Sequence, residues 1–483
     1  MGRAFKFVIL GGGVAAGYAA LEFVKHGVHH GDLCIISEES VAPYERPALS
    51  KGCLLPEGAA TLPSFHTCVG IGAERQTPKW YKEHGIELVL STRVKSVDVK
   101  RKTLLSAAGE TITYKTLIIA TGARVLRLEE FSVTGAYANN ICYLRDLEDA
   151  NKLVQVMDMH KGGTAVVIGG GYIGMECAAA LISNNIGVTM VFPEHHFMAR
   201  LFTAEIAAFY EDYYMKRGVN FIKGTVMAAF ESDENKNVTA VVLKDGTHIK
   251  ADMVVVGIGI RPNISLFEGQ LALEKGGIKV NGKMQTSNAS VYAVGDVVTF
   301  PLKSYRDMRR LEHVDHARKS AAHAVQAILS SDKVKDYDYL PYFYSRVFTL
   351  SWQFYGDNIG DCVIFGTLKD KKFGAFWVEK GQVIGAFLEG GTKEEYITLE
   401  KIARLKPCIT DMESLARLGL SFPFDFKEPV IPHSSLIPFL GERGEALLEK
   451  PSSLFFQVSA GIAVAVGISV FAVWYRKKRR RKC

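Results

Sequence analysis

The sequence has no closely spaced pair of cysteines. The eight cysteines are Cys34, Cys53, Cys68, Cys142, Cys177, Cys362, Cys408 and Cys483, and none stands in a CxxC or CxxxxC spacing. Zinc sites and redox-active dithiols usually carry such pairs, so neither is expected and we predict no bound metal. Reduced, mostly buried thiols in a cytosol-like compartment are the interpretation that remains.

The sequence also lacks a charge imbalance outside its last eight residues. Seven of its 58 lysines and arginines lie at 476–483, and the rest of the chain carries 51 basic and 51 acidic side chains. A neutral body offers no basic surface for nucleic acid, so nucleic acid is not an expected partner. An apolar strand is predicted almost at the first residue, and a cleavable signal peptide is therefore not expected. The length of 483 residues indicates two or three domains.

The opening stretch, 5–17, reads FKFVILGGGVAAG and predicts a dinucleotide-binding turn. Its apolar run at 7–10 is typical of a buried parallel strand, and a helix follows the glycines. Gly11, Gly13 and Ala16 match the dinucleotide fingerprint. In that fingerprint the first glycine permits the turn, the second lets backbone approach a pyrophosphate, and the small third residue lets helix and strand pack closely. The N-terminus of the helix then favours the phosphates.

An acidic pair follows the next predicted strand, at 33–37. Either Glu38 or Glu39 is expected to accept hydrogen bonds from the hydroxyls of an adenosine ribose, and the sequence leaves the choice open. A later apolar run, TLIIATG at 116–122, predicts another buried strand that ends in a glycine turn.

The same design returns at 164–176, TAVVIGGGYIGME. The glycines that complete this second fingerprint are Gly169, Gly171 and Gly174. A strand at 188–192 ends just before Glu194, and VVVGIG at 254–259 repeats the glycine-ended strand. Two complete units are far more specific than one, so we predict two dinucleotide-binding units in one chain.

The second half of the chain predicts a strand and a helix first, then an antiparallel sheet, then two further helices. SVYAVGD at 290–296 predicts a strand that runs into a Gly-Asp turn, and a helix is expected at 314–329. From 342 to about 390 the sequence becomes aromatic and strand-like, which indicates an antiparallel sheet domain. Helical stretches are expected near 394–405 and 412–418.

The stretch 454–475 contains no charged residue and predicts a transmembrane helix. At ~1.5 Å per residue it would span about 33 Å, enough for a ~30 Å hydrocarbon core. Trp474 and Tyr475 would lie at the interface, before the basic tail at 476–483. A buried core helix is the alternative, and the terminal position and the adjoining charges disfavour it.

The two units and SVYAVGD together resemble the two-dinucleotide flavoprotein reductases, over about residues 5–390. The resemblance implies an α/β fold with two Rossmann-like dinucleotide-binding domains and a C-terminal α+β domain. The transmembrane helix predicted from the uncharged stretch would follow them. It implies noncovalent FAD in the first unit and NAD(P)H in the second. The expected segments are 1–124 with 286–332 for FAD, 125–285 for NAD, 333–440 for the C-terminal domain, 441–453 as a linker, 454–475 as the membrane helix and 476–483 as the tail.

The resemblance also implies which residues contact each cofactor. The aspartate of the GD motif, Asp296, would hold the ribityl chain of FAD. The other expected FAD contacts are Gly11, Gly12, Gly13, Val14, Ala15, Glu38, Glu39, Arg46, Lys51, Val94, Arg145, Val314 and Tyr344. The expected NAD contacts are Gly169, Gly170, Gly171, Tyr172, Ile173, Gly174, Met175, Glu176, Glu194, Arg200, Gly259, Glu312, His313 and Tyr344.

Within that family the motifs PYERPALSKG, EHVDHA, YLPYFYSRVF and WQFYGDN look closest to the plant monodehydroascorbate reductases. The disulfide-reductase branch is excluded because only Cys53 lies near the expected flavin. This branch implies that NADH reduces the flavin by hydride transfer, and that two monodehydroascorbate radicals then take one electron each, which regenerates ascorbate and serves peroxide detoxification. The ferredoxin- or rubredoxin-reducing relatives and the apoptosis-inducing factors remain the alternative, since they commonly carry Trp and an acid at the positions of Tyr344 and Arg346.

The radical is an anion, so its site is expected to contain cations. Arg318 lies four residues after Val314 and so on the same helix face, and by resemblance Tyr344 and Arg346 line the opposite wall. A surface salt bridge is the alternative for Arg318. No residue is assigned as a catalytic acid or base.

Glu194 should accept the ribose hydroxyls and repel a 2′-phosphate, which predicts NADH over NADPH. The nearby Arg200 and His195 weaken that inference. Cys68 is interpreted as a buried structural thiol. The basic tail resembles those of peroxisomal membrane proteins, with the mitochondrial outer membrane as second choice, and the sequence leaves open the side that the body faces and the oligomeric state.

Overall fold

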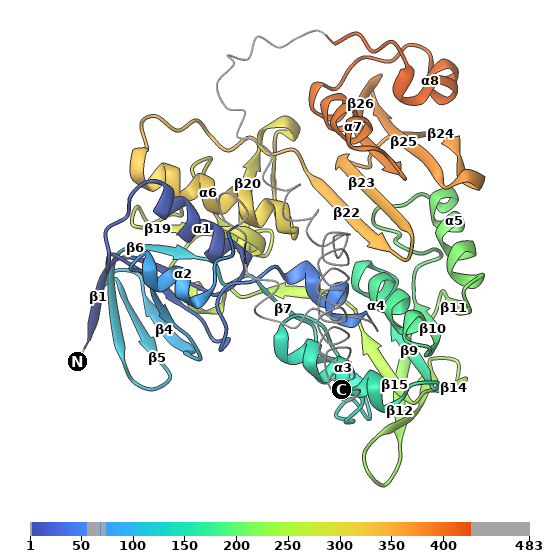
Figure 1. The fold of residues 1–483 in the computed structure, drawn as a ribbon, viewed down its shortest axis with the longest axis horizontal. Helices are drawn as coiled ribbons and strands as arrows, with labels where there is room; N and C mark the ends of the chain where they lie inside the picture. Colours follow the sequence, from blue (N-terminus) through green and yellow to red (C-terminus); the bar gives the residue numbers. More distant parts are fainter. Residues whose placement is uncertain (1, 56–67, 69–73, 427–483) are drawn as a thin grey trace, which may run out of the picture. The chain divides into compact units, whose positions relative to one another are not determined.

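The strand expected at the start of the chain belongs to a seven-stranded sheet in the computed structural model, which describes residues 2–55, 68 and 74–426 (Figure 1). The strands follow the order β3-β2-β1-β6-β5-β4, and β19 pairs with the end of β6. Their bounds are β1 (Arg3–Leu10), β2 (Leu33–Ile36), β3 (Glu87–Val89), β4 (Val94–Asp98), β5 (Thr103–Ser106), β6 (Thr111–Ile119) and β19 (Val291–Ala293). The pairs from β3 through β6 to β19 are parallel, whereas β4 and β5 form an antiparallel hairpin.

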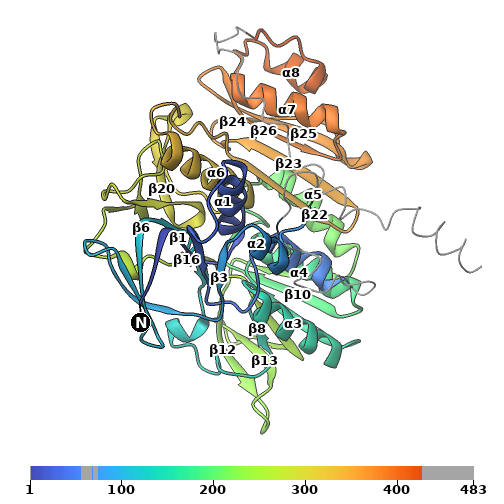
Figure 2. The ribbon, with the colours of Figure 1, turned by 60° about the vertical axis from the view of Figure 1, so that its left-hand side comes forward.

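Two helices that pack against each other cover this sheet. They are α1 (Val14–Lys25), which follows the first fingerprint, and α6 (Val314–Ser330). The prediction of a helix at 314–329 is confirmed, with one further residue at its end. Figures 1 and 2 show the two helices side by side. The strand ends beneath them are buried throughout, as a parallel sheet covered on both faces requires.

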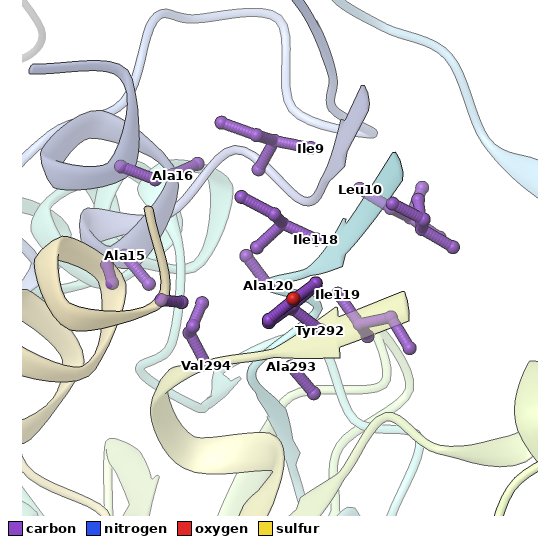
Figure 3. Packing of buried hydrophobic residues seen from close by; sticks show 14 of the residues in the cluster. Ile9, Leu10, Ala15, Ala16, Ile118, Ile119, Ala120, Tyr292, Ala293 and Val294 are labelled. Atoms are coloured by element: carbon purple, nitrogen blue, oxygen red, sulfur yellow. The ribbon is translucent and has the colours of Figure 1, made fainter. Parts of the chain in front are cut away.

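Small residues bring the first fingerprint and the GD motif together. Figure 3 shows Ala15 and Ala16 of α1 close to the strand ends, with Val294 beside them. The next residue, Gly295, has φ +73°, and a Cβ there would stand 3.4 Å from the Cβ of Ala15 and 3.6 Å from that of Ala317. The positive φ disfavours any side chain at Gly295, and a Cβ there would already be in van der Waals contact with both helices.

The second fingerprint begins a five-stranded parallel sheet of the order β11-β10-β9-β15-β8. Its strands are β8 (Ile141–Cys142), β9 (Thr164–Ile168), β10 (Gly187–Phe192), β11 (Val219–Lys223) and β15 (Met253–Val256). The accompanying helices are α3 (Leu147–Met159), α4 (Tyr172–Ser183) and α5 (Ala204–Met215). An antiparallel sheet is inserted before β15, with β12 (Met227–Ser232), β13 (Val238–Leu243) and β14 (His248–Lys250).

Short elements connect these sheets. β7 (Ala123–Val125) and β16 (Ile260–Pro262) pair in antiparallel fashion directly after the two glycine-ended strands. A further sheet contains β17 (Leu273–Glu274), β18 (Gly277–Lys279), β20 (Val298–Leu302) and β21 (Asp307–Arg309). The remaining short helices include η1 (Arg46–Ser50), η2 (Gly52–Leu54), α2 (Pro78–Glu83), η4 (Leu128–Phe131), η5 (Ser265–Phe267), η6 (Gly295–Val297), η7 (Lys303–Tyr305), η8 (Leu368–Asp370) and η9 (Gly419–Ser421).

The aromatic region forms the predicted antiparallel sheet, of the order β22-β23-β26-β25-β24. Its elements are β22 (Tyr342–Val347), β23 (Leu350–Gly356), β24 (Asp361–Thr367), β25 (Lys372–Glu379), β26 (Gln382–Glu389), α7 (Lys393–Leu405) and α8 (Met412–Leu418). α7 and α8 pack on one face (Figure 2), and Trp352 and Phe387 on the other share a core with Phe202 and Tyr210. The sheet is therefore sandwiched between its own helices and α5 with its preceding loop.

The predicted membrane helix at 454–475 lies outside the described residues. Among the residues that the structure does describe, no helix has both the length and the apolar character needed to span a bilayer.

Candidate functional site

Both fingerprints border one continuous cavity of about 2320 Å³. A site for one small molecule usually measures ~300–1,000 Å³, so this volume suits two dinucleotides. The cavity is lined by the glycine turns after β1 and β9, by the acids after β2 and β10, and by residues of α6 and β22. The cavity thus lies at the carboxyl ends of the parallel strands, which is where ligands bind in open α/β sheets.

The first glycine of each fingerprint is required by the same close approach. Gly11 has φ +121°, and a Cβ on it would stand 2.2 Å from the carbonyl oxygen of Ala120. Gly169 has φ +113°, and its Cβ would stand 2.3 Å from the carbonyl oxygen of Gly257. Each carbonyl belongs to the glycine-ended strand of the same unit. In the first unit the GGG turn therefore packs against the ATG turn, and in the second unit the GGG turn packs against the GIG turn.

The third fingerprint position differs between the units. A Cβ on Gly174 would lie 2.1 Å from the carbonyl oxygen of Gly169, so nothing larger fits. In the first unit Ala16 occupies this position and is fully buried. α4 therefore approaches its turn more closely than α1 does.

The acids after β2 have different surroundings, although both line the cavity. Glu39 accepts hydrogen bonds from the Tyr44 hydroxyl at 2.6 Å and from Arg46, whose other nitrogen donates to the carbonyl of Arg145 at 2.8 Å. Glu38 is largely exposed, and its carboxylate lies 3.8 Å from the Arg93 guanidinium. Glu39 is fixed and Glu38 is solvated.

Asp296 of the GD motif also lines the cavity. Arg145 Nη2 donates to its carboxylate at 2.9 Å, while Arg145 Nε donates to the carbonyl of Ala123 at 2.7 Å. One arginine thus links the GD turn to the start of β7.

A buried carboxylate joins three parts of the fold. Glu176 of α4 is 5% exposed and accepts from Lys51 Nζ at 2.7 Å, from Ser345 Oγ at 2.6 Å and from Ser50 Oγ. The Lys51 ammonium lies 6.0 Å from the centre of the Tyr344 ring. Sequence reasoning named Lys51 and Glu176 separately and missed both serines, because no local pattern marks a partner 169 residues away.

His313 is the N-cap residue that precedes α6, and its ring is neutral. Burial lowers its pKa to about 3. Its Nδ1 accepts the backbone N–H of Asp315 at 3.3 Å, so the proton is on Nε2. The ring packs edge-on against Tyr342, Phe343 and Tyr344.

Arg318 of α6 lies outside the lining of the cavity, with its guanidinium 5.4 Å from the centre of the Tyr18 ring. Its Nη2 donates to Glu45 Oε2 at 2.8 Å, and the Tyr18 hydroxyl donates to the other oxygen at 2.9 Å. Burial alone would lower the pKa of Arg318, yet Glu45 and Tyr18 keep it well above its usual value. Within the described residues, Arg318 Nε is buried without a hydrogen-bond partner.

The remaining predicted positions divide into two groups. Glu194, Arg200, Gly259, Glu312 and Tyr344 line the cavity, as do all the predicted FAD positions. Four predicted positions lie outside that lining: Gly174, Met175, Arg318 and Arg346. His195 is exposed and also lies outside it. Residues that sequence reasoning missed, Arg309 and Asn358 among them, also line the cavity.

The cysteines of the described residues are free thiols. Cys68 is fully buried, and burial raises its pKa well above the ordinary value. A Cβ on Gly17 would stand 2.6 Å from its sulfur, so it packs tightly against α1. Burial likewise raises the pKa of Cys53 to about 12. Neither thiol has the thiolate character that electron transfer through a dithiol requires.

The chain is similar to known proteins over its whole length. Residues 5–321 match the family described as pyridine nucleotide-disulphide oxidoreductase, and residues 340–423 match the C-terminal domain described as monodehydroascorbate reductase 3-like. The chain is 64% identical to monodehydroascorbate reductase 4, peroxisomal, of Arabidopsis thaliana, over all of both chains. It is 57% identical to the monodehydroascorbate reductase of Pisum sativum, over 87% of this chain and 99% of that one.

Solved structures share the fold. A ferredoxin reductase from Rhodopseudomonas palustris aligns with a TM-score of 0.75 at 29% identity, over 85% of this chain and 99% of its own. The reductase in a covalent putidaredoxin reductase–putidaredoxin complex aligns with a TM-score of 0.75 at 30% identity, over 84% and 94%.

Proposed function

Because the chain belongs to the monodehydroascorbate reductase family of the pyridine nucleotide-disulphide oxidoreductases, we propose that it uses NADH and bound FAD to reduce the monodehydroascorbate radical. The observation that carries the proposal is the single cavity bordered by two fingerprints, with no dithiol among its lining residues in the described chain. Electrons would therefore leave the flavin directly for the acceptor, with no dithiol between them.

The residues of the first unit fit FAD. The cradle at Gly11 leaves no room for a side chain and exposes backbone N–H groups at the start of α1, where a pyrophosphate is favoured. Of the two acids, Glu39 is the better candidate for the ribose hydroxyls, because Arg46 and Tyr44 already orient it. Asp296, held by Arg145, would bind the ribityl hydroxyls. When bound, FAD accepts a hydride and releases electrons singly, which no side chain can do.

The residues of the second unit fit NADH. Gly169 and Gly171 form the phosphate turn, and Glu194 stands where the adenosine ribose is expected. Its negative charge would repel a 2′-phosphate, whereas Arg200 beside it would attract one, so the balance of the two sets the preference. The buried Glu176, which accepts from Ser345 and from the half-buried Lys51, would fix the geometry between the nicotinamide and the flavin.

Arg318 is proposed as the cation that binds the acceptor. It stays charged while buried, and Glu45 and Tyr18 hold it one helical turn beyond His313 and Val314. Its unsatisfied Nε is a donor that a ligand oxygen can complete, since a buried N–H without a partner is costly. Tyr344 and Arg346, on β22, would form the opposite wall.

Turnover with two acceptors tests the proposal. The purified protein should show the absorbance of a bound flavin. Denaturation should release the flavin, and NADH should bleach its absorbance in the folded protein. Steady oxidation of NADH is expected with enzymatically generated monodehydroascorbate, and little with ferredoxin. A colourless folded protein would refute the flavoprotein assignment. Efficient ferredoxin reduction without radical reduction would favour the class of the solved neighbours.

The C-terminal segment 454–475 is proposed to anchor the protein in the peroxisomal membrane. The support is its uncharged composition, the basic tail, and relatives that are named peroxisomal and match over the whole chain. A chain truncated after Lys450 should be soluble and fully active, while the full chain should sediment with membranes. Recovery of the truncated chain in the membrane fraction would contradict this role, and a mitochondrial location in cells would favour the outer membrane of that organelle.

A further inference from the structure

The turn at 356–358, which follows β23, connects the C-terminal sheet to the adenosine side of the second fingerprint. We propose that Asn358 is a positioning residue for NADH: its side-chain amide holds the backbone segment that carries Arg200 and thereby shapes the adenosine end of the site. The proposal requires NADH to bind in this cavity and is independent of the identity of the electron acceptor.

The turn is a rigid support. Gly356 has φ +90°, and a Cβ on it would stand 2.1 Å from the carbonyl oxygen of Ile384. The N–H of Asp357 donates to that same carbonyl at 2.9 Å. The carboxylate of Asp357 pairs with Arg309 Nη1 at 2.6 Å. Backbone packing and this ion pair therefore fix the position of the Asn358 backbone.

From this support, Asn358 reaches the loop between β10 and α5. Its Nδ2 donates to the carbonyl oxygen of Arg200 at 2.9 Å and to that of Leu201 at 3.3 Å. The loop has no helix or strand of its own. Nearer its middle, the N–H of Met198 donates to the carbonyl oxygen of Gly170 at 2.8 Å and that of Phe197 donates to Glu211 Oε1 at 2.9 Å.

The middle of the loop is thus held by Gly170, Glu211 and its own buried side chains, whereas the carbonyl oxygens of Arg200 and Leu201 are held by Asn358. Glu194, Arg200 and Asn358 all line the cavity. Glu194 and Arg200 are exposed, so their positions depend on the backbone rather than on packing. Losing the amide would release the two carbonyls and let the Arg200 segment move away from the dinucleotide. Both donated bonds go to backbone, so Asn358 acts through the loop and needs no contact with NADH.

The half-reaction that precedes the acceptor tests this role. Flavin reduction is followed by stopped flow over a range of NADH concentrations in the FAD-loaded full chain and in Asn358→Ala and Asn358→Asp. The apparent Kd for NADH should rise about threefold to tenfold, the loss of roughly one hydrogen bond. The limiting rate of flavin reduction should stay within about twofold, since the geometry at the nicotinamide is set elsewhere. Aspartate has nearly the same shape as asparagine, but an ionised carboxylate cannot donate a hydrogen bond. Asn358→Asp should therefore not restore the affinity for NADH.

Asn139→Ala is the matched control. Asn139 Nδ2 also donates to a backbone carbonyl, that of Asn235 at 2.9 Å, on an exposed part of the second unit outside the cavity lining. This variant should leave the Kd for NADH unchanged. The ratio of Kd values for NADPH and NADH should also change in the Asn358 variants, because Arg200 and Glu194 oppose each other at a 2′-phosphate.

Two results would overturn the proposal. One is an unchanged Kd for NADH in both Asn358 variants. The other is a parallel loss of FAD content, thermal stability and limiting rate, which would make Asn358 a general structural residue. Absence of turnover with monodehydroascorbate would count against the proposed acceptor and would leave this measurement unaffected, because flavin reduction is observed before any acceptor is added.

Discussion

Replacing Arg318 by methionine is predicted to weaken both the fold and the acceptor site, and a second substitution separates the two effects. Arg318 and Glu45 form an ion pair of 2.8 Å with side chains only 18% and 14% exposed. Removing one partner of a buried pair leaves an uncompensated charge and costs about 3–5 kcal/mol. Replacing both partners by neutral groups is often close to neutral. The double variant Glu45→Gln/Arg318→Met should therefore regain most of the stability lost in Arg318→Met.

Binding of the radical should not be regained in the double variant. A charge-assisted hydrogen bond to an anion contributes about 1.5–3 kcal/mol, or roughly tenfold to a hundredfold in affinity. The Michaelis constant for monodehydroascorbate should rise by that factor in both variants. Flavin reduction by NADH should change little, since Arg318 lies outside the lining of the dinucleotide cavity. Arg346→Ala is predicted to raise the same Michaelis constant.

Three measurements decide the matter: urea unfolding, stopped-flow flavin reduction by NADH, and steady-state turnover with generated radical. If the double variant recovers stability and radical turnover together, Arg318 is a structural residue. Equal losses in both half-reactions would lead to the same conclusion. Only the combination of recovered stability, retained flavin reduction and a persistently high Michaelis constant supports recognition of the anion by Arg318.

Further variants test the two cofactor sites and the buried His316 of α6. Gly11→Ala should yield colourless protein, because its Cβ would stand 2.2 Å from the carbonyl oxygen of Ala120. Gly187→Ala, whose Cβ would have no atom nearer than 3.7 Å, should retain FAD. Equal flavin content in the two variants would contradict the role of Gly11 in binding FAD. Glu194→Ala should lower the preference for NADH in the ratio of kcat/KM values, and an unchanged ratio would assign discrimination to other residues. Burial lowers the pKa of His316 to about 4. The unfolded chain therefore binds the extra proton first, and the free energy of unfolding should fall as pH drops from about 6.5 toward 4, by up to ~1.4 kcal/mol per pH unit. His316→Phe, whose ring can keep the stacking on Phe300, should show a shallower fall in urea unfolding, and an identical slope would exclude this histidine as the source.

Sequence patterns predicted the elements of this fold well because their causes are local. Buried parallel strands require continuous apolar runs, and the turn after each requires glycine, so Gly11 and Gly169 mark their units wherever the rest of the chain lies. The helix that begins at Val314 and the aromatic antiparallel sheet follow from periodicity in the same way. The resemblance that these motifs support then indicated the family, to which the comparisons assign the chain.

Which side chains act together depends on the packing of segments that are distant in the sequence. Glu45 stands next to a predicted cofactor residue, yet its partner is Arg318, 273 positions later. Ser345 meets Glu176 across 169 positions, and Asn358 meets the Arg200 loop across 158. No short-range pattern encodes such pairs, because each one depends on how separate sheets pack. Local residue patterns are therefore enough to define the two dinucleotide turns and their chemistry, because each turn lies within a short stretch of chain. The ion pair at Arg318, the neutral His313 and the position of the Arg200 loop depend instead on packing between distant segments.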